Sequence, residues 1–202
     1  MVRPGHLPCR VQPDAGGTVR AVPPDDDLVE RIAQDIRARE PIDDRESASI
    51  ERTLAELERL PAPLDERAGP VHVTASAFVV GPRGTVLLKH RRLGIWVQPG
   101  GHIDPGEAPW DAARREGIEE TGLALEFPPG GPRLAHVDVH PSSKGHTHLD
   151  LRYVLDGGDA DPTPPPEESQ DVRWFDWDTA VVRAEPAMGA VLRHLARELG
   201  GA

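Results

Sequence analysis

Two segments in the first third of the chain repeat apolar residues at intervals of three or four positions, the spacing of one helix face. Their apolar stripes are Leu28, Ile32 and Ile36 in residues 25–40, and Ile50, Leu54 and Leu57 in residues 41–61. Ser47 or Ser49 is a candidate N-cap of the second helix, and Pro61 ends it. The pattern predicts a helical hairpin over residues 25–62 that packs as an appendage; contact with a substrate is the alternative.

Alternating and continuous apolar runs further along the chain predict strands. These runs occupy residues 71–80, 85–91, 95–100, 133–140, 146–156 and 171–177. One helical pattern lies between the third and fourth runs, and another covers residues 179–201, with Pro186 near its effective start. Mixed strands with one internal and one C-terminal helix predict an α+β or α/β/α layered domain over residues 70–202.

Composition and charge limit the kinds of partner that this protein can bind. Proline and glycine are frequent in residues 1–24, which show no periodicity, so a flexible tail is expected there. The 34 acidic residues outnumber the 23 basic ones, and the net charge of −11 argues against a protein that binds long nucleic acid. The same charge is compatible with a phosphorylated small substrate, because a divalent metal supplies positive charge locally.

Cysteine usage and hydropathy exclude further classes. Cys9 is the one cysteine, so neither an intrachain disulfide nor a zinc–thiolate site is expected. No window reaches the ~18 apolar residues of a membrane span. The first residues also lack the apolar core of a signal peptide. We therefore expect no membrane partner and, by default, a cytoplasmic location.

The stretch from Gly100 to Leu123 crowds acidic residues onto one short helix. Pro109 suits the first helical position and Gly122 suits the stop, which predicts a helix over residues 109–121. Three glutamates on it follow the spacing i, i+3, i+4, which places their carboxylates on one face; they are Glu116, Glu119 and Glu120. Such like charges repel unless a cation offsets them. Carboxylate oxygens are ligands that Mg²⁺ and Mn²⁺ prefer, so the stripe is a candidate metal site.

The loop before this helix supplies a second set of candidates. Gly100 and Gly101 let the backbone turn sharply and approach closely, so that a main-chain carbonyl can point into the metal site. Glu107 precedes the helix and can pair with Arg115, which would fix the loop against the helix.

The complete pattern resembles the Nudix box of the Nudix (MutT-like) hydrolases. The matching residues are Gly101, Glu107, Arg115, Glu116, Glu119, Glu120, Gly122 and Leu123. One position departs from the box, which prefers an aliphatic residue where this chain has Gly117; we expect Trp110 or Ile118 to fill the gap. The resemblance implies the family's α/β/α sandwich with a mixed β-sheet, here preceded by the helical hairpin.

Residue roles follow from the resemblance, position by position. It implies that Mg²⁺ or Mn²⁺ is held by the carbonyl of Gly100 and by three glutamates, Glu116, Glu119 and Glu120. It also implies that an ion pair between Glu107 and Arg115 stabilises the loop. The general base is either a box glutamate or a distant acid, for which Glu168 is the candidate and Glu167 its rival. An ordinary solvated pair of loop acids is the competing interpretation of these two.

A histidine-rich segment forms another cluster. His136, Asp138 and His140 share one strand face, and His146, His148 and Asp150 share a face of the next strand. Three interpretations stay open: a nitrogen-rich second metal site, a polar wall of the substrate cleft, and a solvent-facing sheet surface with the intervening apolar residues inward. The candidate substrate-binding residues are Arg91, Arg92, His140, Lys144 and His148.

The resemblance implies an enzyme that cleaves the diphosphate linkage of a nucleoside diphosphate joined to another moiety, with a small nucleotide derivative as partner and a homodimer as a common assembly. A non-catalytic Nudix-fold module that binds a nucleotide or a partner is the alternative. An isomerase of the isopentenyl-diphosphate type is disfavoured, because its expected active-site cysteine is absent and Cys9 lies in the predicted tail. The sequence does not indicate which diphosphate is cleaved.

Overall fold

The computed structural model describes residues 25–142 and 145–200, and the tail predicted for residues 1–24 lies outside this part. Its centre is a mixed sheet in the strand order β3-β2-β1-β6-β5, with β4 paired to β1 and β7 paired to β2. The strands are β1 (Val71–Gly81), β2 (Gly84–Lys89), β3 (Trp96–Val97), β4 (Gly100–His102), β5 (Arg133–Pro141), β6 (Thr147–Asp156) and β7 (Val172–Phe175). The long pair β1 and β6 is parallel, and the other pairs are antiparallel.

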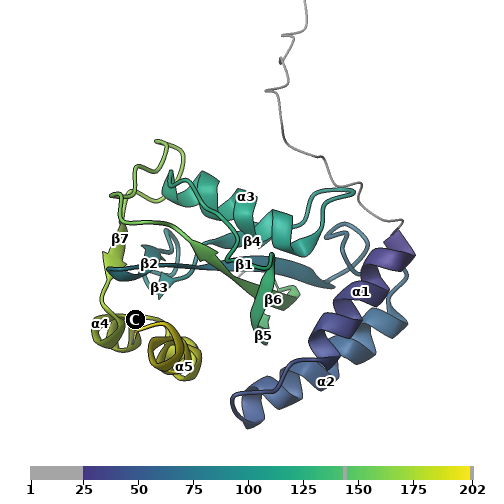
Figure 1. The fold of residues 1–202 in the computed structure, drawn as a ribbon. Helices are drawn as coiled ribbons and strands as arrows, with labels where there is room; N and C mark the ends of the chain where they lie inside the picture. Colours follow the sequence, from purple (N-terminus) through teal and green to yellow (C-terminus); the bar gives the residue numbers. More distant parts are fainter. Residues whose placement is uncertain (1–24, 143–144, 201–202) are drawn as a thin grey trace, which may run out of the picture.

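Helices cover both faces of this sheet, as Figure 1 shows. One face carries α3, and the opposite face carries α4 and α5, while α1 and α2 lie along the side of β5. The helices are α1 (Asp25–Arg37), α2 (Asp44–Arg59), α3 (Pro109–Thr121), α4 (Trp177–Arg183) and α5 (Gly189–Leu199). The predicted α/β/α sandwich with an N-terminal pair of helices is confirmed. Each helix in the described residues is too short or too polar to cross a bilayer.

Two local predictions need correction. The cap of α2 is Asp43, whose carboxylate accepts a hydrogen bond from the Glu46 amide at 2.8 Å; Ser47 and Ser49 lie inside the helix. The single helix predicted for residues 179–201 is divided into α4, a 3₁₀ turn that starts at Pro186, and α5. A residue before proline avoids the α region, which explains why the chain leaves the helical path there.

The N-terminal helices join the core of the sheet. Leu28, Ile32 and Ile36 of α1 are buried in one cluster with apolar residues of β5 and β6. On α2, Glu46 accepts a hydrogen bond from the amide of Val137 at 3.0 Å, and Ser49 accepts one from Val139 at 3.2 Å. Amides of β5 that would face outward from an edge strand are therefore satisfied by side chains. A domain boundary between residues 62 and 70 stays a prediction.

The space above Gly117 on α3 is filled by Leu125, contrary to the expectation of Trp110 or Ile118. A Cβ at Gly117 would lie 2.6 Å from Cδ1 of Leu125. Trp110 packs in another part of the core, and Ile118 is 38% exposed. The sequence pattern missed this contact because Leu125 lies beyond the helix and returns over it.

We expect Gly117→Ala to lower the free energy of unfolding by about 1 kcal/mol, because overpacking against Leu125 outweighs the better helix propensity of alanine. In a Leu125→Ala background the same change should instead stabilise the chain, since the obstructing side chain is gone. Urea unfolding of the four variants measures both effects. An equal effect of Gly117→Ala in the two backgrounds would contradict this packing.

We expect Glu46→Ala to lower the free energy of unfolding by about 3 kcal/mol, because it leaves the amide of Val137 and the guanidinium of Arg39 without their acceptor. Glu51→Ala, an exposed glutamate on the same helix, is the control and should cost under about 0.5 kcal/mol. Thermal and urea unfolding measure the difference, and equal losses would contradict the role of Glu46.

Candidate active site

The helix α3 has the ends that its sequence predicts. Pro109 occupies the first turn, and Gly122 follows the last turn with a φ of 68°, in the left-handed region that glycine adopts readily. A Cβ at Gly122 would lie 2.1 Å from the carbonyl oxygen of Thr163. Glycine at this position therefore ends the helix and also lets the loop between β6 and β7 pass closely.

Two glycines of β4 lie beside the carboxylates of α3. The amide of Gly100 donates a hydrogen bond to Oε2 of Glu120 at 2.8 Å. A Cβ at Gly101 would lie 2.5 Å from the carboxylate of Glu116, so a larger residue would displace that carboxylate. Glu119 lies further out, with 54% of its side chain exposed. Glu116 and Glu120 thus lie against β4 where α3 crosses it, and Glu119 is joined to them through Arg115.

Arg115 connects this group of acids to the loop before the helix. Its guanidinium donates to both carboxylate oxygens of Glu107, at 3.0 and 2.9 Å, and to the carbonyl of His102 at 2.9 Å. It also contacts Glu116 at 2.8 Å and Glu119 at 3.4 Å. The hydrogen bonds that Arg115 donates to Glu107 raise its pKa above the ordinary value, and the one it donates to Glu116 adds to this effect. A permanent positive charge is therefore fixed between the loop and the glutamates.

Burial and neighbouring charges disfavour the ionised state of Glu120 and Glu116. Burial is the main cause that raises the pKa of Glu120 to about 8; the negative charges of Glu116, Glu168 and Glu119 act in the same direction, and the hydrogen bond from Gly100 opposes them. Burial also raises the pKa of Glu116. A divalent cation would reverse this balance, because it attracts every carboxylate that now repels its neighbours.

The loop acids differ in their relation to the glutamates. Glu168 is half-buried, and its charge acts on Glu120, whereas the side chain of Glu167 is exposed. Arg91 donates a hydrogen bond to the backbone carbonyl of Glu167, so it holds this loop. Arg92 is exposed beside it. Lys144 lies outside the described residues.

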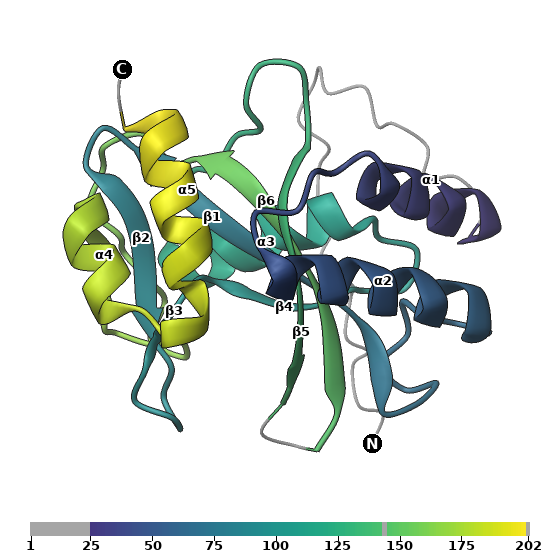
Figure 2. The same cartoon turned by 90° about the horizontal axis from the view of Figure 1, so that it is seen from below.

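The histidine-rich strands form a buried polar surface on the sheet face opposite α3. His136, Asp138 and Asp150 are 3%, 2% and 1% exposed, so a solvent-facing surface is the wrong interpretation for them. Figure 2 shows α5 and α2 on the two sides of β5 and β6 on this face. The predicted pairing of neighbouring faces is present: Asp138 lies opposite Asp150, and His140 lies opposite His148.

Arg152 makes burial of the two aspartates possible. Its guanidinium donates to Asp138 and to Asp150, both at 2.8 Å. Asp150 also accepts from Ser76 at 2.7 Å, and Asp138 accepts from Arg45 of α2 at 2.8 Å. Burial opposes ionisation of Asp138, but its hydrogen bond with His140 and the charge of Arg152 hold its pKa below the ordinary value. A charged network of this kind is stable when every carboxylate has partners.

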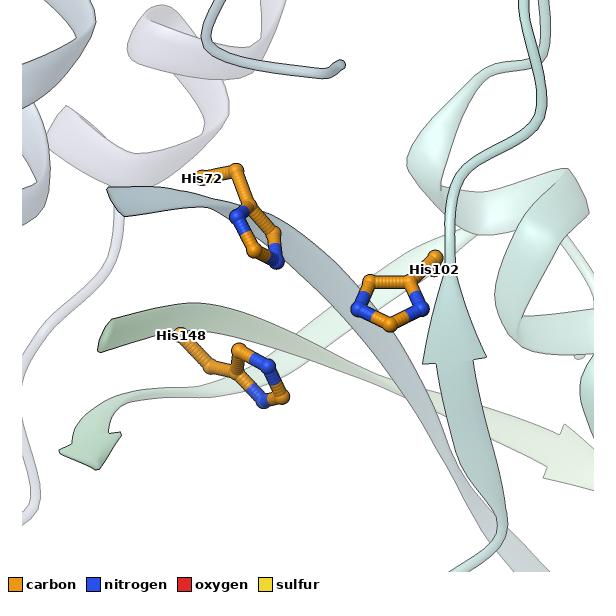
Figure 3. Close-up of side chains that lie close together, drawn as sticks. All are labelled: His72, His102 and His148. Atoms are coloured by element: carbon orange, nitrogen blue, oxygen red, sulfur yellow. The ribbon is translucent and has the colours of Figure 1, made fainter. Parts of the chain in front are cut away.

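Two histidines that the sequence analysis did not single out join this surface. His72 of β1 and His102 of β4 lie beside the predicted residue His148 of β6, as Figure 3 shows. Burial, with the neighbouring imidazoles acting in the same direction, lowers the pKa of His148 to about 4. The parallel pairing of β1 with β6 brings these residues together, and no local pattern in the sequence indicates that pairing.

A family model described as the NUDIX domain matches residues 70–199, more than half of the chain. The chain belongs to the Nudix family. Nudix hydrolases act on pyrophosphate bonds and generally need a divalent metal such as Mg²⁺. The match begins just before β1 and ends in α5, so α1 and α2 precede the family domain.

Relatives of known name divide between two reactions. An isopentenyl-diphosphate Delta-isomerase of Streptomyces griseus is 35% identical over 57% of this chain and 61% of its own length. An asymmetrical bis(5'-nucleosyl)-tetraphosphatase of Caenorhabditis elegans is 31% identical over 52% of this chain and 77% of its own length. The chain therefore spans about three fifths of the isomerase. A MutT Nudix hydrolase of Burkholderia pseudomallei is similar in structure, with a TM-score of 0.50, 27% identity, and coverage of 60% of this chain and 95% of that one.

We expect Glu120→Gln to stabilise the metal-free chain at pH 9 and to have little effect at pH 4. The pKa of about 8 in the folded chain lies above the unfolded value of 4.5. The stabilisation that protonated Glu120 contributes is therefore complete below pH 4.5 and is lost as the pH rises through 8, by up to roughly 5 kcal/mol. Thermal unfolding in a chelator measures this, with Glu51→Gln as control. A pH-independent difference would contradict the burial of Glu120.

Proposed function

We propose that this Nudix protein hydrolyses the diphosphate linkage of a nucleoside diphosphate joined to another moiety. The observation that supports this proposal best is the position of Glu120 and Glu116 against Gly100 and Gly101 of β4, with Glu119 joined to them through Arg115. A module that only binds nucleotides has no need for three such acids on one helix face, where burial raises the pKa of Glu116 and Glu120.

The donor set fits a hard dication. Glu116, Glu119 and Glu120 offer carboxylate oxygens, Gly100 offers a backbone carbonyl, and Gly101 leaves no Cβ in the way. We assign these groups to Mg²⁺ or Mn²⁺. When bound, such an ion neutralises diphosphate oxygens and lowers the pKa of a water molecule.

The remaining steps belong to side chains of the chain itself. Arg115 and Glu107 fix the loop against α3, so that the carboxylates keep one geometry during turnover. Glu168, from the loop that passes Gly122, takes the proton of the attacking water, because its charge already reaches Glu120. Glu167 turns its side chain to solvent and is the weaker candidate.

The isomerase reaction of some relatives is the competing activity. The expected isomerase cysteine has no counterpart, because the one cysteine, Cys9, lies outside the residues that match the family domain. Other relatives are named as a bis(5'-nucleosyl)-tetraphosphatase and a putative 8-oxo-dGTP diphosphatase, both of which carry nucleotide substrates in their names. We therefore favour a nucleotide substrate. Assembly as a homodimer and a cytoplasmic location stay predictions.

The proposal predicts Mg²⁺-dependent cleavage of at least one compound in a panel of nucleoside triphosphates, dinucleoside polyphosphates, ADP-ribose, nucleotide sugars and isopentenyl diphosphate. Glu119→Gln should lower kcat/KM about 100-fold or more, because it removes a metal ligand, while Glu51→Gln should retain activity. Mass spectrometry of the products measures both. Turnover at the level of the blank, or equal activity of Glu119→Gln, would favour a binding module, and isomerisation alone would favour the competing reaction.

The assignment of the base predicts different effects for two adjacent acids. Glu168→Gln should lower kcat by about 100-fold with little change in KM, because the base acts in the chemical step and not in substrate binding. Glu167→Gln should keep both kinetic constants, since its side chain is exposed. Steady-state kinetics compare the two variants, and an unchanged kcat in Glu168→Gln would return the role of base to a glutamate of α3.

A further inference from the structure

Three histidines from three strands turn their rings toward one another on the sheet face opposite α3 (Figure 3). One ring nitrogen from each lies within 4.8 Å of the others. The ring centroid of His72 is 5.2 Å from that of His102 and 5.2 Å from that of His148, and the centroids of His102 and His148 are 5.6 Å apart. Sheet pairing fixes this arrangement, because His72 is the partner of His148, and His102 is the partner of Thr74, two residues further along β1.

Neighbouring groups orient two of these rings. Nδ1 of His72 lies 3.3 Å from the carbonyl oxygen of Gly69, and Nδ1 of His102 lies 3.2 Å from the carboxylate of Glu66. Histidines that bind metals usually donate one ring N–H to a carbonyl or carboxylate, which leaves the other nitrogen for the metal. His72 is 0% exposed, and its buried Nε2 has no hydrogen-bond partner. A buried acceptor without a partner is costly, so this nitrogen points to a ligand.

We propose that His72, His102 and His148 bind a first-row transition metal such as Zn²⁺ or Co²⁺, at a site separate from the carboxylates of α3. Imidazole nitrogens suit these metals, whereas Mg²⁺ takes oxygen ligands. Tetrahedral binding needs ligand nitrogens ~3.3 Å apart. The ring nitrogens therefore move closer together by ~1 Å or more when the ion binds, and small side-chain rotations allow this movement. Three histidines leave one position for water or an anionic group.

Occupation of this site would couple two parts of the fold. β4 is three residues long and carries Gly100, which contacts Glu120, as well as His102. A metal that joins His102 to His72 and His148 ties β4 to both long central strands. The expected result is a higher melting temperature, independent of any hydrolysis.

Cobalt titration tests the site directly. The full chain, without a polyhistidine tag, is stripped with a chelator and titrated with Co²⁺ in saturating Mg²⁺, which occupies the carboxylates of α3. We expect visible absorption bands of four-coordinate Co²⁺ that saturate at one equivalent, and a rise in melting temperature. His148→Ala and, separately, His102→Asn should weaken binding by about 100-fold or more, and Glu66→Gln by about 10-fold.

Two variants serve as matched controls. His194→Ala removes a histidine of α5 outside the cluster, and Glu119→Gln removes a carboxylate of α3; both should retain the bands. Circular dichroism checks that each variant is folded. Absence of the bands in the unaltered chain, their persistence in both folded histidine variants, or their loss in Glu119→Gln would overturn the proposal. Because no outcome of this test depends on turnover, failure of the metal-site proposal does not bear on the proposed hydrolase activity.

Discussion

Repulsion among carboxylates on α3 is the constraint around which this region is arranged. Glu116 and Glu120 are half-buried against β4, where burial alone favours their neutral forms. Arg115 offsets part of the negative charge and at the same time ties the preceding loop to the helix through Glu107. The fold thus tolerates a concentration of charge that would destabilise an isolated helix, and a dication relieves what remains.

The parts that could be predicted are those where a residue acts through its own backbone or its near neighbours. Pro109 and Gly122 set the ends of α3 by local conformational rules, and the spacing of its glutamates follows from helix geometry. Prediction failed where a distant contact decided the outcome. Leu125 fills the space above Gly117, and Arg152 neutralises the aspartates of β5 and β6, but neither role leaves a local pattern.

The strand β4 separates two kinds of chemistry by the alternation of its side chains. Its middle residue, Gly101, faces α3 and the carboxylate of Glu116, and the next residue, His102, faces the imidazoles of His72 and His148. Successive residues of a strand point to opposite faces, so oxygen donors and nitrogen donors lie on the two sides of one short strand. The backbone joins them, since the carbonyl of His102 accepts a hydrogen bond from Arg115.

The side chains of α2 that satisfy the amides of β5 have a consequence for self-association. Glu46 and Ser49 occupy donors that a strand from another molecule would need in order to extend the sheet. Edge-to-edge aggregation and strand exchange at β5 are therefore blocked as long as α2 stays docked. A dimer of this protein would have to use helices, loops or another edge of the sheet. A chain shortened before β1 would expose the unpaired amides of β5, which α2 covers in the intact molecule.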